Sequence, residues 1–149
     1  LSGTIRRDGA NATSAMIELV RGGRFRGHIQ AVLLQGIAVG GFNVVDVQAL
    51  AAALNVPVLV IMRRRPRLES MRTALLKNIP GAARKWSLIE AAGPVEPLGQ
   101  VFCQRVGLSL REAQALLAAT TLHGNLPEAL RLAHLIAGGV TTGKSRGRA

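Results

Sequence analysis

Two short apolar runs, residues 29–34 and residues 58–62, constrain the fold of this 149-residue chain more than any other feature. Each run is shorter than an ordinary helix and ends abruptly at polar residues, which is typical of strands buried in a sheet. Between them, a glycine-containing loop leads to Asn43, which is predicted to cap a helix running to Leu54, with Asp46 at its third position. The order strand, helix, strand predicts a parallel pair of strands.

The same alternation continues on both sides of this unit. Residues 4–7 are expected to end an earlier strand at Asp8, and a helix capped by Asn11 or Thr13 should follow to about Val20. Downstream, the patterns predict two helices, a strand and a helix that opens with a capping box, over residues 68–77, 82–86, 101–104 and 109–121 respectively. The expected architecture is an α/β fold with parallel strands alternating with helices, in one domain over residues 1–140.

Three polar residues follow the three expected strands. Asp8, Gln35 and Arg63 each stand where a strand stops. Because the carboxyl ends of parallel strands meet at one edge of a sheet, these residues are expected to lie together in a site. For Asp8, an Asx turn that simply ends the strand is the alternative. An acid at Asp46 would stabilise a helix start without binding any ligand.

A late helix carries its polar side chains at intervals of three. Asn125 can cap it, Pro127 suits its first turn, and the pair of glycines at 138–139 is expected to end it. Glu128, Arg131 and His134 then share one flank of an otherwise apolar helix. One interpretation is an ion pair beside a satisfied histidine, and the other is a functional row.

The charge balance favours an anionic partner. Nineteen Lys and Arg against eight Asp and Glu give a formal net charge of +11, concentrated in short clusters. A chain this basic should accumulate on nucleic acid, although such clusters are also common on plain solvated surfaces. Residues 141–149, with Lys144 and Arg146, are expected to form a flexible basic tail. Aromatic residues are too few for a base-stacking platform.

Other classes of protein are disfavoured. No apolar run approaches the roughly 20 residues of a membrane span, so no membrane partner is expected. The lone Cys103 excludes an internal disulfide and favours a packed residue in a cytoplasmic protein. No Cys or His spacing suggests zinc.

Several motifs together resemble one known family. They are GGFNVVD at 40–46, PVLVIMRR at 57–64, PEALRLAHLIA at 127–137 and GKSRGR at 143–148. In this combination the chain resembles an archaeal domain family of unknown function, also called the endonuclease dU family, over nearly its whole length. That family is in turn distantly similar to endonuclease V, which has a ribonuclease-H-like fold and cuts deaminated nucleic acid with Mg²⁺.

The resemblance implies a site and also two departures from it. The strand-end acids of endonuclease V look like Asp8 and Gln35, its strand-end lysine looks like Arg63, and its late helix looks like residues 127–134. Gln35 is a carboxamide in place of an acid, so it would hold a metal more weakly. The ribonuclease-H-like fold also begins with two further strands, the first of which supplies an aspartate. The chain is therefore expected to lack the N-terminal hairpin, being either a fragment or a protein that draws this acid from elsewhere.

The function implied is metal-dependent hydrolysis of phosphodiesters near deoxyuridine or deoxyinosine in DNA repair. Asp8 and Gln35 would hold Mg²⁺ or Mn²⁺, Arg63 would neutralise the scissile phosphate, and His134 would assist proton transfer. The expected contacts to nucleic acid, with DNA as the first candidate, are Gly41, Phe42, Asn43, Arg64, Arg65, Arg131, Lys144 and Arg146. A core position for Phe42 is an equal alternative. The competing hypothesis is a basic nucleic-acid-binding module without catalysis.

Overall fold

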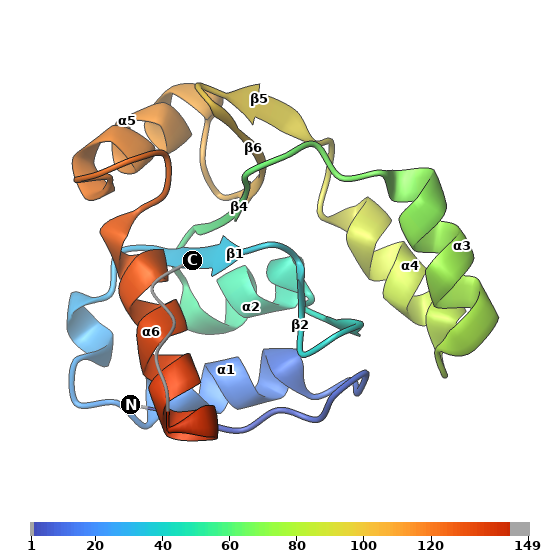
Figure 1. Ribbon diagram of the computed structural model, residues 1–149. Helices are drawn as coiled ribbons and strands as arrows, with labels where there is room; N and C mark the ends of the chain where they lie inside the picture. The colour runs from blue at the N-terminus through green and yellow to red at the C-terminus, as the bar shows by residue number, and fades with distance from the viewer. Residues whose placement is uncertain (1, 144–149) are drawn as a thin grey trace.

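The computed structural model describes residues 2–143, which form a mixed α/β fold around a four-stranded sheet (Figure 1). Its strands lie in the order β1 (Val32–Gln35), β4 (Val58–Met62), β6 (Val101–Val106) and β5 (Glu96–Leu98). A separate hairpin pairs β2 (Ala38–Val39) with β3 (Asn43–Val44). The helices are α1 (Ala12–Arg21), the 3₁₀ helix η1 (Arg26–His28), α2 (Val47–Leu54), α3 (Leu68–Asn78), α4 (Ala82–Ala91), α5 (Leu110–Thr120) and α6 (Glu128–Thr142).

The two apolar runs that dominate the sequence form the parallel pair that they predict. β4 has the predicted bounds, and β1 begins three residues later than expected, after η1. The register places Val32 beside Val58 and Gln35 beside Ile61, with α2 in the connection between the strands. The carboxyl ends of β1 and β4 therefore lie at the same edge of the sheet.

The prediction of an all-parallel sheet is wrong beyond this pair. β6 runs antiparallel to β4, with Met62 beside Phe102, and β5 runs antiparallel to β6. The physical reason is the turn between β5 and β6. β5 runs in the same direction as β4, and Gly99 and Gln100 alone separate it from β6. Because a two-residue turn can join only antiparallel strands, β6 runs against both.

The expected strand over residues 4–7 is also absent from the described structure. The amide of Arg6 donates to Asn11 Oδ1 at 3.0 Å, and its carbonyl accepts from Asn43 Nδ2 at 2.9 Å. Because side chains already satisfy these backbone groups, this segment needs no strand partner.

The core has one cluster on each face of the sheet. Alternate β4 residues separate to the two sides: Val58 and Val60 enter one cluster, and Leu59 and Ile61 enter the other. Helices α1 and α2 cover the first face, whereas α5 covers the second, as Figure 1 shows. All four side chains are at most 1% exposed. β4 is therefore the central strand that organises both layers.

Helix starts are partly as predicted. The capping box is confirmed, because Ser109 Oγ accepts from the Glu112 amide and Glu112 Oε2 accepts from the Ser109 amide. The cap predicted at Asn43 is wrong, since Asn43 lies in β3 and Asp46 caps α2 by accepting from the Ala49 amide at 2.9 Å.

The late helix differs from its prediction at both ends. Its N-cap is Pro127 instead of Asn125, and it continues past the two glycines to Thr142, where Gly143 ends it in the left-handed region. Glycine weakens a helix by only about 1 kcal/mol, so two glycines do not have to end one. Within the described residues, no helix is long and apolar enough to cross a membrane.

Candidate nucleic-acid interface

Asp8 occupies a strained turn that is tied to the β2–β3 hairpin. Its φ of 53° lies in the left-handed region, and its amide donates to the Gly40 carbonyl at 2.9 Å. Its carboxylate Oδ1 accepts from the Phe42 amide at 2.7 Å. A Cβ at Gly41 would collide with this carboxylate. Asp8 therefore holds hairpin backbone that is 34 residues away, and not a local Asx turn at the end of a strand; its other oxygen, Oδ2, lies 3.8 Å from Arg7 Nε.

Asn43 connects the same turn to α1. Its side chain is fully buried; Oδ1 accepts from the Ala12 amide at 3.0 Å, and Nδ2 donates to Arg6 and Asn11. The predicted contact between Asn43 and nucleic acid is wrong, because every polar atom of the side chain is used inside the protein. Phe42 packs against the core cluster that contains Val58 and Val60, as expected if it is a core residue and not a contact to nucleic acid.

A buried lysine completes this region. Lys85 is 5% exposed, and its Nζ donates to the Asp8 carbonyl at 2.6 Å. It lines a cavity of about 580 Å³ together with Asp8, Asp46, Thr13 and Arg84. The sequence reasoning missed Lys85, because an Arg-Lys pair on a helix carries no signal that separates a buried cation from a solvated one.

Gln35 and Arg63 meet the expectation of a shared sheet edge. Gln35 pairs with Ile61, and the amide of the next residue, Gly36, donates to the Ile61 carbonyl at 3.0 Å. Arg63 directly follows β4. Gln35 is exposed and its carboxamide has no hydrogen-bond partner among the described residues. Asp8 contacts the tip of the β2–β3 hairpin, whereas Gln35 precedes its base. The expected trio is therefore a pair at the sheet edge, with Asp8 at the far end of the hairpin.

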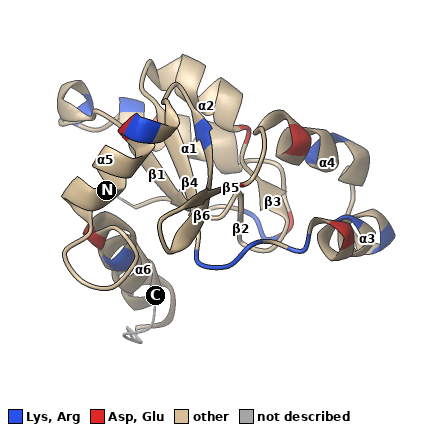
Figure 2. Ribbon diagram, turned by 90° about the horizontal axis from the view of Figure 1, so that it is seen from above, with Lys and Arg blue, Asp and Glu red and all other residues tan. Residues whose placement is uncertain are grey.

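Residues 63–67, hereafter the basic loop, carry the strongest local charge at this edge. Its four arginines are exposed, and none of their guanidinium groups has a hydrogen-bond or ion-pair partner within residues 2–143. Figure 2 shows the loop as a continuous basic segment beside β2. Pro66 of this loop and the segment 36–38 line one small cavity, which confirms that the two are neighbours. The arginines are Arg63, Arg64, Arg65 and Arg67.

The late helix carries the predicted ion pair. Arg131 Nε donates to both carboxylate oxygens of Glu128, at 2.9 and 3.0 Å, and this hydrogen bonding holds the pKa of Glu128 below its ordinary value. His134 is exposed. In Figure 1, α6 runs down the left of the molecule, whereas the turn before α1 lies at the lower right. The structure does not bring His134 to Asp8, and its role in proton transfer stays a prediction.

The remaining candidates give no further site. Burial raises the pKa of the Cys103 thiol, so Cys103 is the packed residue expected and not a nucleophile. Gly41 is exposed at the hairpin tip. Lys144 and Arg146 lie outside the described residues. Among those residues, no three His, Cys, Asp or Glu side chains gather into a group that could hold a metal ion.

The sequence has close relatives along its whole length. A UPF0215 protein of Deinococcus radiodurans is 55% identical over 148 residues, which cover 99% of this chain and 75% of the relative. A UPF0215 protein of Archaeoglobus fulgidus is 38% identical over 142 residues, covering 95% of this chain and 78% of the relative. The Deinococcus relative shows that the similarity extends beyond archaea.

The fold is shared with a solved structure. The crystal structure of a protein of unknown function from Archaeoglobus fulgidus matches with a TM-score of 0.89 at 36% identity, covering 93% of this chain and 79% of that one. The family model described as "Endonuclease dU" matches residues 1–141. The chain therefore belongs to the endonuclease dU family.

Proposed function

We propose that the chain binds nucleic acid through the basic loop and acts in an endonuclease that cuts phosphodiesters near deaminated bases, a DNA-repair role. The observation that carries the proposal is the set of four exposed, unpartnered arginines at the carboxyl edge of β4. Guanidinium groups bind phosphate oxygens in bidentate geometry, and an unpaired group needs no internal ion pair to be broken first. The family name supports the cleavage part of the proposal.

The ribonuclease-H-like assignment belongs to the same proposal. Its support is the parallel pair β1–β4, connected through α2, with the polar Gln35 ending β1 and Arg63 following β4 at one edge. Arg63 and Arg64 directly follow β4, close to Gln35 at the end of β1. A phosphate bound by these two arginines would therefore lie at the carboxyl ends of both strands.

A divalent cation is a separate question for this site. Mg²⁺ needs six oxygen ligands and usually takes one or two carboxylates, with waters and substrate phosphates filling the remainder. Within residues 2–143, Asp8 Oδ1 accepts from the Phe42 amide, Oδ2 lies 3.8 Å from Arg7 Nε, and no group of three His, Cys, Asp or Glu side chains gathers here. The described side chains do not fit a cation site of their own. The roles that we assign are therefore phosphate binding by the basic loop and turn positioning by Asp8.

An incision assay tests the proposal. Labelled DNA carrying one deoxyuridine or deoxyinosine is incubated with the chain in Mg²⁺, Mn²⁺ or EDTA, beside undamaged DNA. We expect cutting near the deaminated base and none in the undamaged DNA, and the EDTA sample tests whether cutting requires a cation that the described side chains do not hold by themselves. The triple variant R63Q/R64Q/R65Q should bind and cut far less. Asp8→Asn keeps an acceptor for the Phe42 amide and tolerates the left-handed turn, so it removes the charge alone.

The second candidate function is a basic binding module without catalysis. Gln35 in place of an acid and the absence of a ligand cluster among the described residues favour it. Salt-sensitive binding without cutting under any metal condition would support the module and reject the nuclease. Failure to bind DNA at low salt would reject both.

A further inference from the structure

We propose that a separate cavity, between α5 and the β5–β6 turn, receives an unpaired nucleobase of the bound nucleic acid. This inference rests on the proposed function for the presence of nucleic acid, but the cavity has its own chemistry. Its volume of about 420 Å³ falls in the range typical of small-molecule sites. Its lining residues are Leu98, Gly99, Gln100, Gln114, Leu117, Ala118, Thr121, Gly124 and Asn125.

The lining of this base pocket is uncharged, although the chain has a net charge of +11. A phosphate or carboxylate would find no cation in it, and a metal ion would find no carboxylate. Three carboxamides, from Gln100, Gln114 and Asn125, each provide hydrogen-bond donors and an acceptor. The edge of a nucleobase presents the same neutral mixture of donors and acceptors.

The polar groups of the pocket are available for a ligand. None of the three carboxamides makes a hydrogen bond to another described residue. Thr121 Oγ1 is buried and also has no hydrogen-bond partner in this part of the chain. Buried polar atoms are nearly always paired, so this hydroxyl, on a residue that lines the cavity, has a bonding capacity that no described residue uses.

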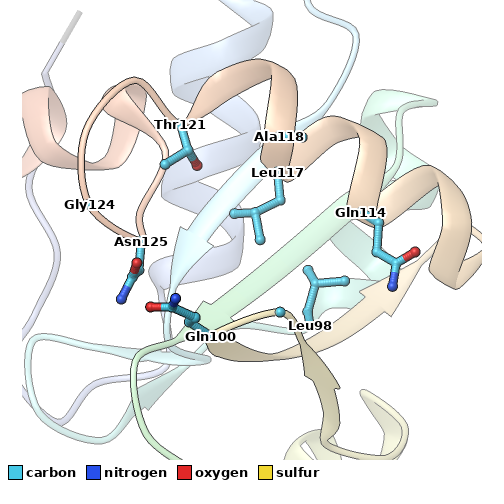
Figure 3. Close-up of a pocket in the computed structure, with 9 residues that line it drawn as sticks. Leu98, Gln100, Gln114, Leu117, Ala118, Thr121, Gly124 and Asn125 are labelled. Atoms are coloured by element: carbon cyan, nitrogen blue, oxygen red, sulfur yellow. The ribbon is translucent and has the colours of Figure 1, made fainter.

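The arrangement suits a flat ring. Figure 3 shows Thr121, Asn125 and Gln100 on one side of the pocket and Gln114 on the other, with Leu98 and Leu117 between them. A ring lying on the two leucines would have its edge surrounded by the polar side chains. Apolar contact with the face and hydrogen bonds to the edge are how proteins hold a base taken out of the stack.

The pocket lies at the same end of the sheet as the basic loop. Met62, the last residue of β4, pairs with Phe102, and Gln100 is two residues before Phe102. Arg63 directly follows Met62. A strand whose phosphates bind the basic loop can therefore present a neighbouring base to this pocket.

The test compares oligonucleotides that differ at one base. Fluorescence anisotropy measures the affinity of the chain for single-stranded DNA with one uracil and for the same DNA with an abasic site. The variants are Gln114→Leu and Thr121→Val, which keep the size of the side chain and remove its polar atoms. Gln30→Leu, an exposed position outside the pocket lining, is the matched control.

We expect the pocket variants to bind the uracil DNA about tenfold more weakly, the equivalent of losing one or two hydrogen bonds, and the abasic DNA unchanged. Gln30→Leu should match the wild type on both. Thermal unfolding checks that each variant folds. An unchanged ratio of the two affinities in both variants would overturn the pocket assignment while leaving the basic loop intact.

A second measurement separates this proposal from the proposed function. Free deoxyuridine or deoxyinosine is added to the ¹⁵N-labelled chain, and the side-chain amide signals of Gln100, Gln114 and Asn125 are followed by NMR. Shifts at these signals support the base pocket even if DNA binding fails. Signals that do not move at millimolar nucleoside, together with the unchanged affinity ratio, reject it.

Discussion

The turn at Asp8 and the basic loop are both polar regions near the same hairpin, but their side chains are used in opposite ways. In the turn, Asp8, Asn43 and Lys85 are each bonded to backbone atoms within the protein. In the basic loop, four guanidinium groups have no partner among the described residues. Polar residues that are satisfied internally hold the fold, whereas unpartnered ones can bind a ligand without first losing a bond.

The largest effect on stability is expected at Asn43. Asn43→Ala removes three hydrogen bonds and leaves the amide of the buried Ala12 without its partner, so the free energy of unfolding should fall by roughly 2–4 kcal/mol. Urea unfolding measures the change. Asn78→Ala, at an exposed position of α3, is the control and should change stability by less than about 0.5 kcal/mol. Equal losses in the two variants would show that the Asn43 network does not hold the turn.

A pair of glycines isolates the position of the Asp8 carboxylate. Gly36 and Gly41 have φ of 80° and 83°, so an alanine at either site carries a similar backbone strain of about 1 kcal/mol. A Cβ at Gly36 meets nothing within 4 Å, but at Gly41 it meets the Asp8 carboxylate. Gly41→Ala should therefore be clearly less stable than Gly36→Ala in the same urea titration. If both variants are destabilised by the same amount, the carboxylate moves freely.

An intermediate effect is expected at the capping box, which is satisfied internally but exposed. Ser109→Ala should cost about 1 kcal/mol at neutral pH. Hydrogen bonds from Ser109 lower the pKa of Glu112 from its ordinary 4.5. The stabilisation from a lowered pKa is complete above that ordinary value and is lost as the pH falls through the folded-state pKa.

The difference in stability between wild type and Ser109→Ala should therefore shrink as the pH is lowered below about 4.5. Thermal unfolding between pH 3 and pH 7 measures it, with Ser87→Ala, on an exposed face of α4, as the control. A difference that grew on acidification would contradict the assigned hydrogen bonds.

The smallest effect on stability is expected in the basic loop. R63Q/R64Q/R65Q removes no internal bond and should change the free energy of unfolding by less than about 0.5 kcal/mol. The slope of log affinity against log salt for double-stranded DNA should become shallower by about 0.9 for each phosphate that the variant no longer neutralises. A large drop in stability would show that these arginines are bonded inside the protein, and an unchanged slope would show that they do not neutralise DNA phosphates. Either result would contradict the contrast between the turn at Asp8 and the basic loop.

The sequence predicted the parts of the fold that depend on local patterns. The apolar run 58–62 matches the bounds of β4, and Ser109 with Glu112 marked the start of α5. The meeting of Gln35 and Arg63 also followed from the sequence, since two successive buried strands with a helix between them pair in parallel. The Glu128–Arg131 pair followed from helical spacing.

The errors in the predicted roles of polar residues involve partners that are distant in the chain. Asn43 has the composition of a helix cap, but its bonds go to Arg6, Asn11 and Ala12, more than 30 residues away. The same bonds explain why residues 4–7 form no strand. Lys85 carried no signal at all, because its burial depends on the approach of Asp8 from 77 residues earlier.

The sequence alone therefore determined the central strands, the helices beside them, the positive charge and the family. The tertiary structure decided which polar residues hold the fold and which remain available, the antiparallel placement of β6 and the uncharged pocket beside α5. The physical reason is that apolar periodicity and capping act over a few residues, whereas the satisfaction of a polar group depends on whatever the folded chain brings to it.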